Sequence, residues 1–139
     1  MTTTAAERVL TELDHSRLSK LIGSQTALLP DAVLDPLQDL LIDAHIVPSR
    51  EVRDDTVTMY AQIQVHLNGS EAPSKIALCY PADAEPASGF VSVLSPMGLA
   101  LLGLSIGQTA QWHSPNGDPM TAWVERILFQ PEASGDYVT

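Results

Sequence analysis

The sequence is short of cysteine, of positive charge and of long apolar runs. A single cysteine among 139 residues excludes an internal disulfide and a multi-cysteine metal site. Seven lysines and arginines stand against 17 aspartates and glutamates, a formal charge of −10, whereas phosphate binding needs clustered cations. The apolar run 97–104 is far shorter than the roughly 20 residues of a membrane span, and no export signal is visible. We therefore predict a soluble cytoplasmic protein with no membrane association and no strong nucleic-acid binding of its own.

Motifs for catalysis and metal binding are also lacking. The histidines at positions 15, 45, 66 and 113 have no partner at ligand spacing, and His15 and His45 lie on predicted helices. Cys79 lies in an alternating pattern with no neighbour that would stabilise a thiolate, which favours a small strand residue. The segment 103–107 has the spacing of a nucleophile elbow, but it follows a predicted helix instead of preceding one. We predict no catalytic residue, no metal and no cofactor.

Composition divides the chain near Pro48. Leucines at helical spacing dominate the first part, and every aromatic residue falls in the second. The joint 48–51 is too short to be a tether, so we expect the two parts to pack closely. We predict a short helical hairpin over residues 1–48 and a β-rich domain over residues 49–139.

The first helix of the hairpin has two possible starts. Thr4 to Glu7 fits a capping box, but Asp14 would equally cap a helix that follows a short strand around residues 8–11. We expect this helix to end at Gly23, because glycine tolerates the left-handed conformation common beyond helix ends.

The second helix has a clearer predicted start. Asp35 stands at the N-cap position and Pro36 at the first helical position, while Pro48 forbids continuation. About 11 residues at 1.5 Å each give a helix of about 16 Å, joined to the first by the loop 23–34.

The second part has the signals of a twisted antiparallel sheet covered by one short helix. Apolar residues alternate from Val57 to Leu67, which is the period of a half-buried strand. Ser95 and Pro96 predict the start of a small helix that Gly103 closes. The remaining strands are predicted at residues 76–80 and 90–94 and in a hairpin of 108–113 with 120–129.

Four aspartates, at positions 31, 35, 39 and 43, repeat at a spacing of four. A pair of loop carboxylates such as Asp31 and Asp35 can hold a divalent cation that also binds phosphates, but a helix cap beside a solvated aspartate is the plainer interpretation. The stripe as a whole is typical of a solvated helix face and would also suit a basic groove on a partner.

Several segments of the second part resemble a known family. The segment 93–107, VLSPMGLALLGLSIG, resembles part of the C-terminal domain of the Gre factors. The ending 128–137, LFQPEASGDY, is similar to the ending of the Rnk family, the regulators of nucleoside diphosphate kinase. Residues 56–59 and 80–82 match that family in order and spacing.

The resemblance implies an α+β fold: a short N-terminal antiparallel coiled coil followed by an FKBP-like C-terminal domain. It also implies binding of bacterial RNA polymerase at the entrance of its secondary channel, where Gre factors dock. Gre factors carry a long hairpin whose acidic tip helps to bind magnesium for transcript cleavage. Because the hairpin here is short, we expect a monomeric regulator that competes with Gre factors and does not cleave transcripts efficiently.

The expected polymerase contacts lie on the small-helix region and on the hairpin tip. The tip residues are Asp31 and Asp35. The small-helix residues are Ser95, Pro96, Met97, Gly98, Gly103 and Gly107.

Two alternatives remain open from the sequence. The FKBP-like fold allows a peptidyl-prolyl isomerase, although that enzyme needs an aromatic-lined pocket and aromatic residues make up 5% of this chain. The hairpin also allows a protein-interaction module that dimerises through Leu37, Leu40 and Leu41, if these side chains are left exposed.

Overall fold

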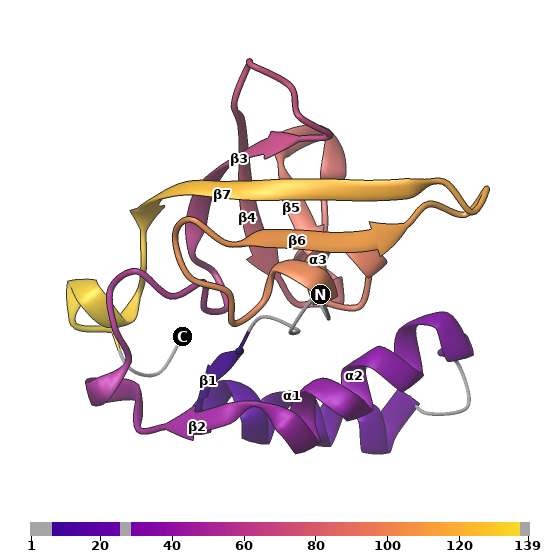
Figure 1. Cartoon of the computed structure of the whole chain (residues 1–139). Helices are drawn as coiled ribbons and strands as arrows, with labels where there is room; N and C mark the ends of the chain where they lie inside the picture. The colour runs from indigo at the N-terminus through magenta and orange to yellow at the C-terminus, as the bar shows by residue number, and fades with distance from the viewer. Residues whose placement is uncertain (1–6, 26–28, 137–139) are drawn as a thin grey trace.

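A computed structural model describes residues 7–25 and 29–136 of the chain. Two helices, α1 and α2, lie side by side below a curled sheet that carries the short helix α3 on the side facing them (Figure 1). Helices and strands occupy separate stretches of the chain, so the predicted α+β class is confirmed. In the described residues, no helix is both long and apolar enough to cross a membrane.

The first helix follows a short strand. Strand β1 spans Val9–Thr11 and α1 spans Glu12–Gln25. The Thr11 hydroxyl accepts a hydrogen bond from the Asp14 amide at 3.0 Å, so Thr11 caps the helix and Asp14 does not. The predicted end at Gly23 is wrong by two residues, because Gly23 does not adopt the positive φ that would end the helix there.

Helix α2 begins earlier than predicted. It spans Asp31–Asp43 after Pro30, so Asp35 and Pro36 lie inside it and Asp35 is not its N-cap. Val33 and Leu37, four residues apart, are both buried, and their packing favours a helix that continues through the proline. Thirteen residues give a length of about 20 Å, longer than the predicted 16 Å.

A second short strand closes the base of the hairpin. Ala44 is extended, and β2 (His45–Val47) pairs in parallel with β1, Val9 lying opposite His45. The prediction placed His45 on the second helix and is wrong there. A three-residue strand is too short for alternating polarity to reveal it.

The main sheet has five strands in the order β5-β4-β3-β7-β6. All neighbouring pairs are antiparallel except β4 and β5, so the sheet is mixed and departs in this pair from the antiparallel prediction. The crossover between them runs through two single-turn 3₁₀ helices, η3 (Pro81–Asp83) and η4 (Pro86–Ser88). The strands are β3 (Gln62–Leu67), β4 (Ser74–Cys79), β5 (Phe90–Ser92), β6 (Thr109–His113) and β7 (Pro119–Phe129).

Strand β3 is shorter than the predicted strand 57–67. Residues 56–59 are all buried, so burial does not alternate there, and Tyr60 has a positive φ of 64° that interrupts extended structure. The small helix α3 (Pro96–Leu101) and the β6–β7 hairpin confirm their predictions.

One hydrophobic core joins both parts of the chain. Leucines of the helical hairpin pack in the same cluster as α3 and the inner face of the sheet. Leu37 is fully buried, Leu40 is 7% exposed and Leu41 is half-buried against the core, so they do not form the exposed stripe that dimerisation through these leucines would need.

Candidate functional site

The predicted contact surface on α3 begins with a helix cap. The Ser95 hydroxyl accepts a hydrogen bond from the Gly98 amide at 3.1 Å and donates one to the Ser92 carbonyl at 2.7 Å. Pro96 follows at the first helical position and is exposed, while Met97 is half-buried. This end of α3 therefore leaves Pro96 exposed and holds it in a fixed orientation.

Two of the predicted contact residues are buried glycines. A Cβ on Gly98 would lie 2.1 Å from the Ser92 carbonyl oxygen. Gly103 has φ +84°, and its Cβ would lie 3.0 Å from the carbonyl oxygen of Val9. Both positions allow close backbone approach and shape the surface from beneath.

Gly107 lies at the other end of the predicted surface and is exposed. Its φ is +92° with open space around it. Its amide donates to the Val124 carbonyl, and its own carbonyl accepts a hydrogen bond from the Trp123 indole at 3.2 Å. Trp123, which bonds Gly107, is 43% exposed, and Ile106, the residue before Gly107, is 44% exposed. Two large apolar side chains are therefore exposed at this turn.

The aspartates of α2 form a continuous exposed stripe. Asp31, the first residue of the helix, and Asp35 lie nearest the tip of the hairpin, and Asp39 and Asp43 continue towards its base. All four are exposed, and no basic residue lies in the last turn. Like charges at a spacing of four repel one another, so this stripe weakens the isolated helix and makes this face of the hairpin strongly negative.

The helical hairpin is fastened to the C-terminal part at α3. The Arg8 guanidinium donates to the carbonyls of Leu99 and Leu102, at 2.9 and 2.8 Å, and so binds the carboxyl end of the helix. Nearby, the Val9 amide donates to the Gly103 carbonyl at 3.0 Å. Burial lowers the pKa of Arg8, which still carries its charge at neutral pH.

A second fastening is the buried side chain of Asp14, and a second buried acid, Glu132 of the C-terminal part, lies near it. Asp14 of α1 is 1% exposed, and its carboxylate accepts a hydrogen bond from the Met59 amide at 3.2 Å. Glu132, 8% exposed, accepts one from the Thr58 hydroxyl at 2.7 Å. Burial, with Glu132 nearby, raises the pKa of Asp14 to about 6, although the bond from Met59 works against the rise.

Gln130 fixes the segment that leads from the hairpin to the sheet. Its side-chain amide donates to the carbonyls of Arg53 and Thr56, each at 2.8 Å. The Gln-Pro-Glu run at 130–132, one of the segments that resembles the Rnk family, therefore has a structural role in this chain. Sequence reasoning treated it only as a likeness, and Asp14 only as a possible cap.

The histidines and the cysteine have ordinary surroundings. His15 bonds the Leu41 carbonyl at 2.9 Å, and His66 contacts Glu125 at 3.1 Å. The described residues include no group of three histidine, cysteine or acidic side chains placed to hold a metal ion. Cys79 is buried in β4, and burial raises the pKa of its thiol, which is the opposite of what a nucleophile needs.

Known proteins share both the sequence and the architecture. The family model described as "Transcription elongation factor, GreA/GreB, C-term" matches residues 52–128. The "Regulator of nucleoside diphosphate kinase" of Escherichia coli K12 is 32% identical over 131 residues, covering 94% of this chain and 95% of that protein. The chain belongs to the Rnk family. A "Transcription elongation factor GreA" from Christiangramia forsetii is more distant, at 28% identity over 66% of this chain and 61% of its own length.

A solved structure extends the likeness of this Rnk-family chain to the hairpin. The "Prokaryotic transcription elongation factor GreA/GreB from Nitrosomonas europaea" is 27% identical, with a TM-score of 0.73 over 88% of this chain and 100% of that one. The Rnk-family protein is thus a Gre-related regulator, and its relatives are regulators or transcription factors by name.

Proposed function

We propose that this Rnk-family protein binds bacterial RNA polymerase at the entrance of the secondary channel and competes there with Gre factors. The observation that carries the proposal is the match to a GreA/GreB structure over the whole length of that structure, the hairpin included. Two surfaces of this chain are suited to the contact: the exposed rim of α3 with the following turn, and the acidic stripe of α2.

The rim would supply the uncharged part of the contact. Pro96 and Gly107 are exposed at its two ends, with Ile106 beside Gly107. Exposed apolar side chains near rigid backbone lose little conformational entropy when they are buried against a partner. Ser95 and Gly98 hold Pro96 in place through the helix cap.

The acidic stripe would supply the electrostatic part. Four exposed aspartates on one helix face attract a basic surface from a distance and make association sensitive to salt. Helix α2 is only about 20 Å long, so the tip carboxylates Asp31 and Asp35 would stop well short of a deep active site. The protein would occupy the channel entrance as a monomer without efficient transcript cleavage.

We keep the division predicted from the sequence, with residues 1–48 as the hairpin part and residues 49–139 as the second domain. The described residues of the first part include α1, α2 and the closing strands, and the second contains the segment 52–128 that the Gre family model matches. Any effect on nucleoside diphosphate kinase, which the relatives' name records, would be an indirect consequence of altered transcription.

Competition for purified core polymerase tests the proposal. A fluorescently labelled Gre factor is bound to the polymerase, and the full chain is added at low and at high salt. Displacement at low salt that weakens as salt rises is the expected result. Failure to displace the Gre factor at any salt concentration would sink the proposal.

Paired variants assign the contact. The Asp31→Asn/Asp35→Asn double variant should displace the Gre factor less well at low salt and approach the wild type at high salt. Glu71→Gln, an exposed carboxylate in the loop between β3 and β4, is the matched control and should behave as wild type. Ile106→Ser should weaken displacement equally at both salt concentrations, because its contribution is apolar.

Three cavities formed by the described residues do not favour the isomerase alternative. They each include one aromatic residue in their lining, Trp112, Tyr80 and Phe129 respectively, whereas a proline pocket needs several converging rings. A proline-isomerisation assay on a short peptide should therefore give the uncatalysed rate.

A further inference from the structure

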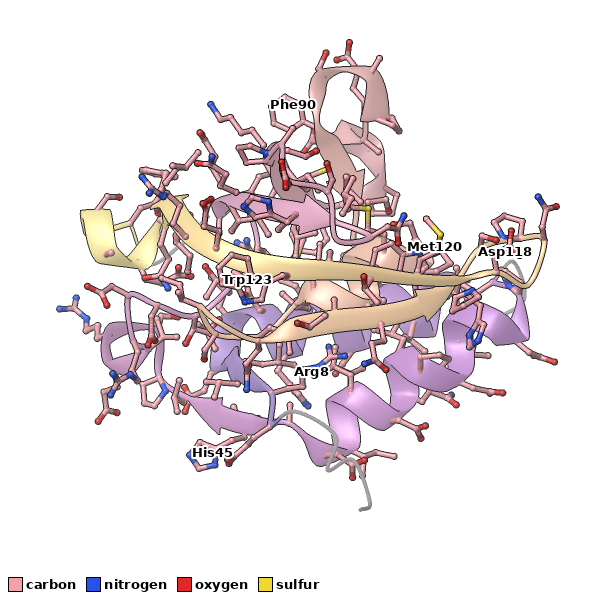
Figure 2. The ribbon with its side chains drawn as sticks, turned by 45° about the horizontal axis from the view of Figure 1, so that its top comes forward. Arg8, His45, Phe90, Asp118, Met120 and Trp123 are labelled. Carbon is pink, nitrogen blue, oxygen red and sulfur yellow. The ribbon has the colours of Figure 1, made fainter. Side chains whose placement is uncertain are left out.

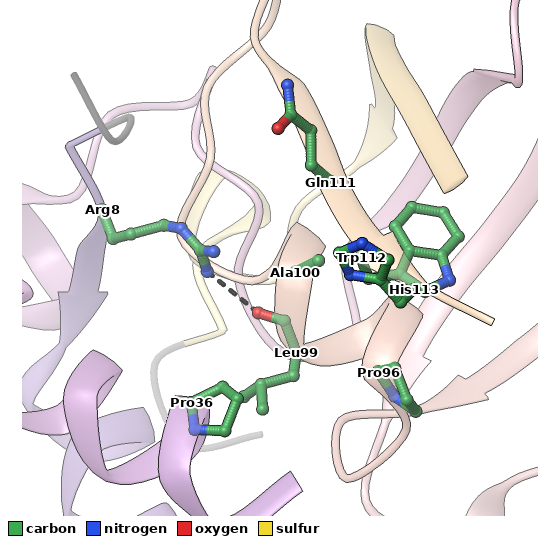
Figure 3. A pocket seen from close by; sticks show the side chains of 8 residues that line it. All are labelled: Arg8, Pro36, Pro96, Leu99, Ala100, Gln111, Trp112 and His113. Carbon is green, nitrogen blue, oxygen red and sulfur yellow. Dashed lines mark hydrogen bonds between the residues drawn. The ribbon is translucent and has the colours of Figure 1, made fainter. Parts of the chain in front are cut away.

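A cavity of about 380 Å³ lies where the hairpin, α3 and the edge of the sheet meet (Figure 3). Pro36 of α2 and Leu99 and Ala100 of α3 give it an apolar wall. The side chain of Arg8 borders the same space opposite β6, between the strand and the hairpin (Figures 2 and 3). The cavity is therefore apolar on one wall and cationic at one point.

The remaining wall is β6 itself, which is an edge strand. The Ser114 amide donates to Asp118 and the Val124 amide to Gln108, at 2.8 and 2.9 Å. Along an antiparallel pair of strands, every second pair of opposite residues exchanges hydrogen bonds. Ala110 and Trp112 therefore also hydrogen-bond to their partners on β7, Ala122 and Met120. The amides and carbonyls of Thr109, Gln111 and His113 consequently point away from β7.

Two of these outward-facing residues, Gln111 and His113, line the cavity. Within the described residues, their outward backbone groups have no hydrogen-bond partner in the protein. Both residues are exposed. An open edge of this kind is the template on which an extended peptide adds a strand.

Arg8 adds a charge requirement. Its Nη1 donates to two backbone carbonyls, but among the described residues no carboxylate lies within ion-pair distance of it. Guanidinium carries five N–H donors, so Nε and Nη2 remain to bind an anionic group. A half-buried cation without a counter-ion is best complemented by a carboxylate.

We propose that the edge of β6 binds an extended peptide segment of another protein by strand addition, and that this segment carries an acidic residue two positions from an apolar residue. Side chains two positions apart lie on one face of a strand. On the face turned to α3, one such side chain would rest on Pro36 and Leu99 while the other would meet Arg8. The site is separate from Gly107 and from the acidic stripe but shares Pro96 with the proposed polymerase contact, and its test uses no polymerase.

The probes are two blocked tripeptides, acetyl-Leu-Thr-Asp-amide and acetyl-Asp-Thr-Leu-amide, because the direction of the added strand is not fixed by the cavity. Each has a matched peptide with Asn in place of Asp. Amide hydrogen exchange and chemical shifts of the full chain are followed by NMR during titration. The expected result is millimolar binding of one Asp peptide that slows exchange at the Gln111 and His113 amides and leaves those of Ala110 and Trp112 protected throughout.

Three variants distinguish the contribution of the backbone hydrogen bonds of β6 from that of the Arg8 charge. Gln111→Pro removes an outward-facing amide without touching the ladder to β7, and it should abolish binding. Thr109→Pro makes the same change on the same strand outside the cavity and should leave binding intact. Arg8→Gln should reduce the preference for the Asp peptide over the Asn peptide from about tenfold to none.

Three outcomes would overturn the proposal. One is the absence of any shift at Gln111 and His113 at millimolar peptide, a result that does not depend on any variant folding. Another is equal affinity of the Asp and Asn peptides for the wild type. The third is slow exchange at both amides in the free protein together with dimers in sedimentation, since the edge would then be occupied by a second copy of the chain.

Discussion

Replacement of Asp14 by asparagine should stabilise the protein at neutral pH. The pKa of this buried carboxyl rises from an ordinary value of 3.8 to about 6, so the folded state binds its proton more tightly than the unfolded state does. Stability linked to this group is therefore greatest in acid and falls as the pH rises from about 4 to about 6. At about 1.4 kcal/mol for each tenfold change, the full cost is about 3 kcal/mol at pH 7 and roughly half of that at pH 5.

Asparagine keeps the shape and can still accept the hydrogen bond from Met59, but it carries no charge. Urea denaturation of Asp14→Asn and wild type at several pH values should show a gain of up to about 3 kcal/mol at pH 7 that shrinks towards pH 4. Asp31→Asn is the matched control on an exposed residue, and it should cost up to about 0.5 kcal/mol through the lost helix-dipole interaction. A destabilised Asp14→Asn protein at pH 7, or a difference that does not vary with pH, would refute the reasoning.

Four further predictions concern the packing and the hydrogen bonds of the fold. Gly98→Ala should lower the free energy of unfolding by at least about 3 kcal/mol, because its Cβ would lie 2.1 Å from the Ser92 oxygen. Gly107→Ala, with open space but a φ of +92°, should cost only about 1–2 kcal/mol in the same urea titration. Pro36→Ala should raise the unfolding free energy by about 1–2 kcal/mol by restoring a hydrogen bond within α2, and an unchanged midpoint would contradict this. Gln130→Ala should cost about 1–3 kcal/mol by leaving the buried Thr56 carbonyl unpaired, while the Arg53 carbonyl keeps its bond from the Thr56 amide, and calorimetry would detect the loss as a lower Tm.

Elements with a strong local signal were predictable from the sequence. Ser95 and Pro96 mark the start of α3 because cap chemistry acts within one helical turn. The same rules misplaced the start of α2 at Asp35, because tertiary burial of Val33 and Leu37 outweighs the local preference of proline for a first turn. Local sequence rules therefore predict the start of a helix correctly only where long-range packing does not compete with them.

The features that depend on distant partners were not predictable. Strand β2 has no pattern of its own and exists because β1 lies beside it, while β1 corresponds to the short strand around residues 8–11 that the sequence left as one of two alternatives. The burial of Asp14 depends on Met59, far along the chain, and the parallel pairing of β5 depends on how the crossover folds. Likewise, the exposure of Gly107 and the burial of Gly98 in one predicted surface depend on what packs against each.

The parallel pair of β1 and β2 has a consequence for how this architecture can vary. The pair joins both ends of the hairpin at its base, next to α3, and the described residues nearest the tip have no part in this pairing. Whole helical turns can thus be inserted or removed at the tip in matched pairs, each changing the reach by about 5.4 Å, with the base unaltered. The base of the hairpin therefore fixes its direction, whereas its length can change independently.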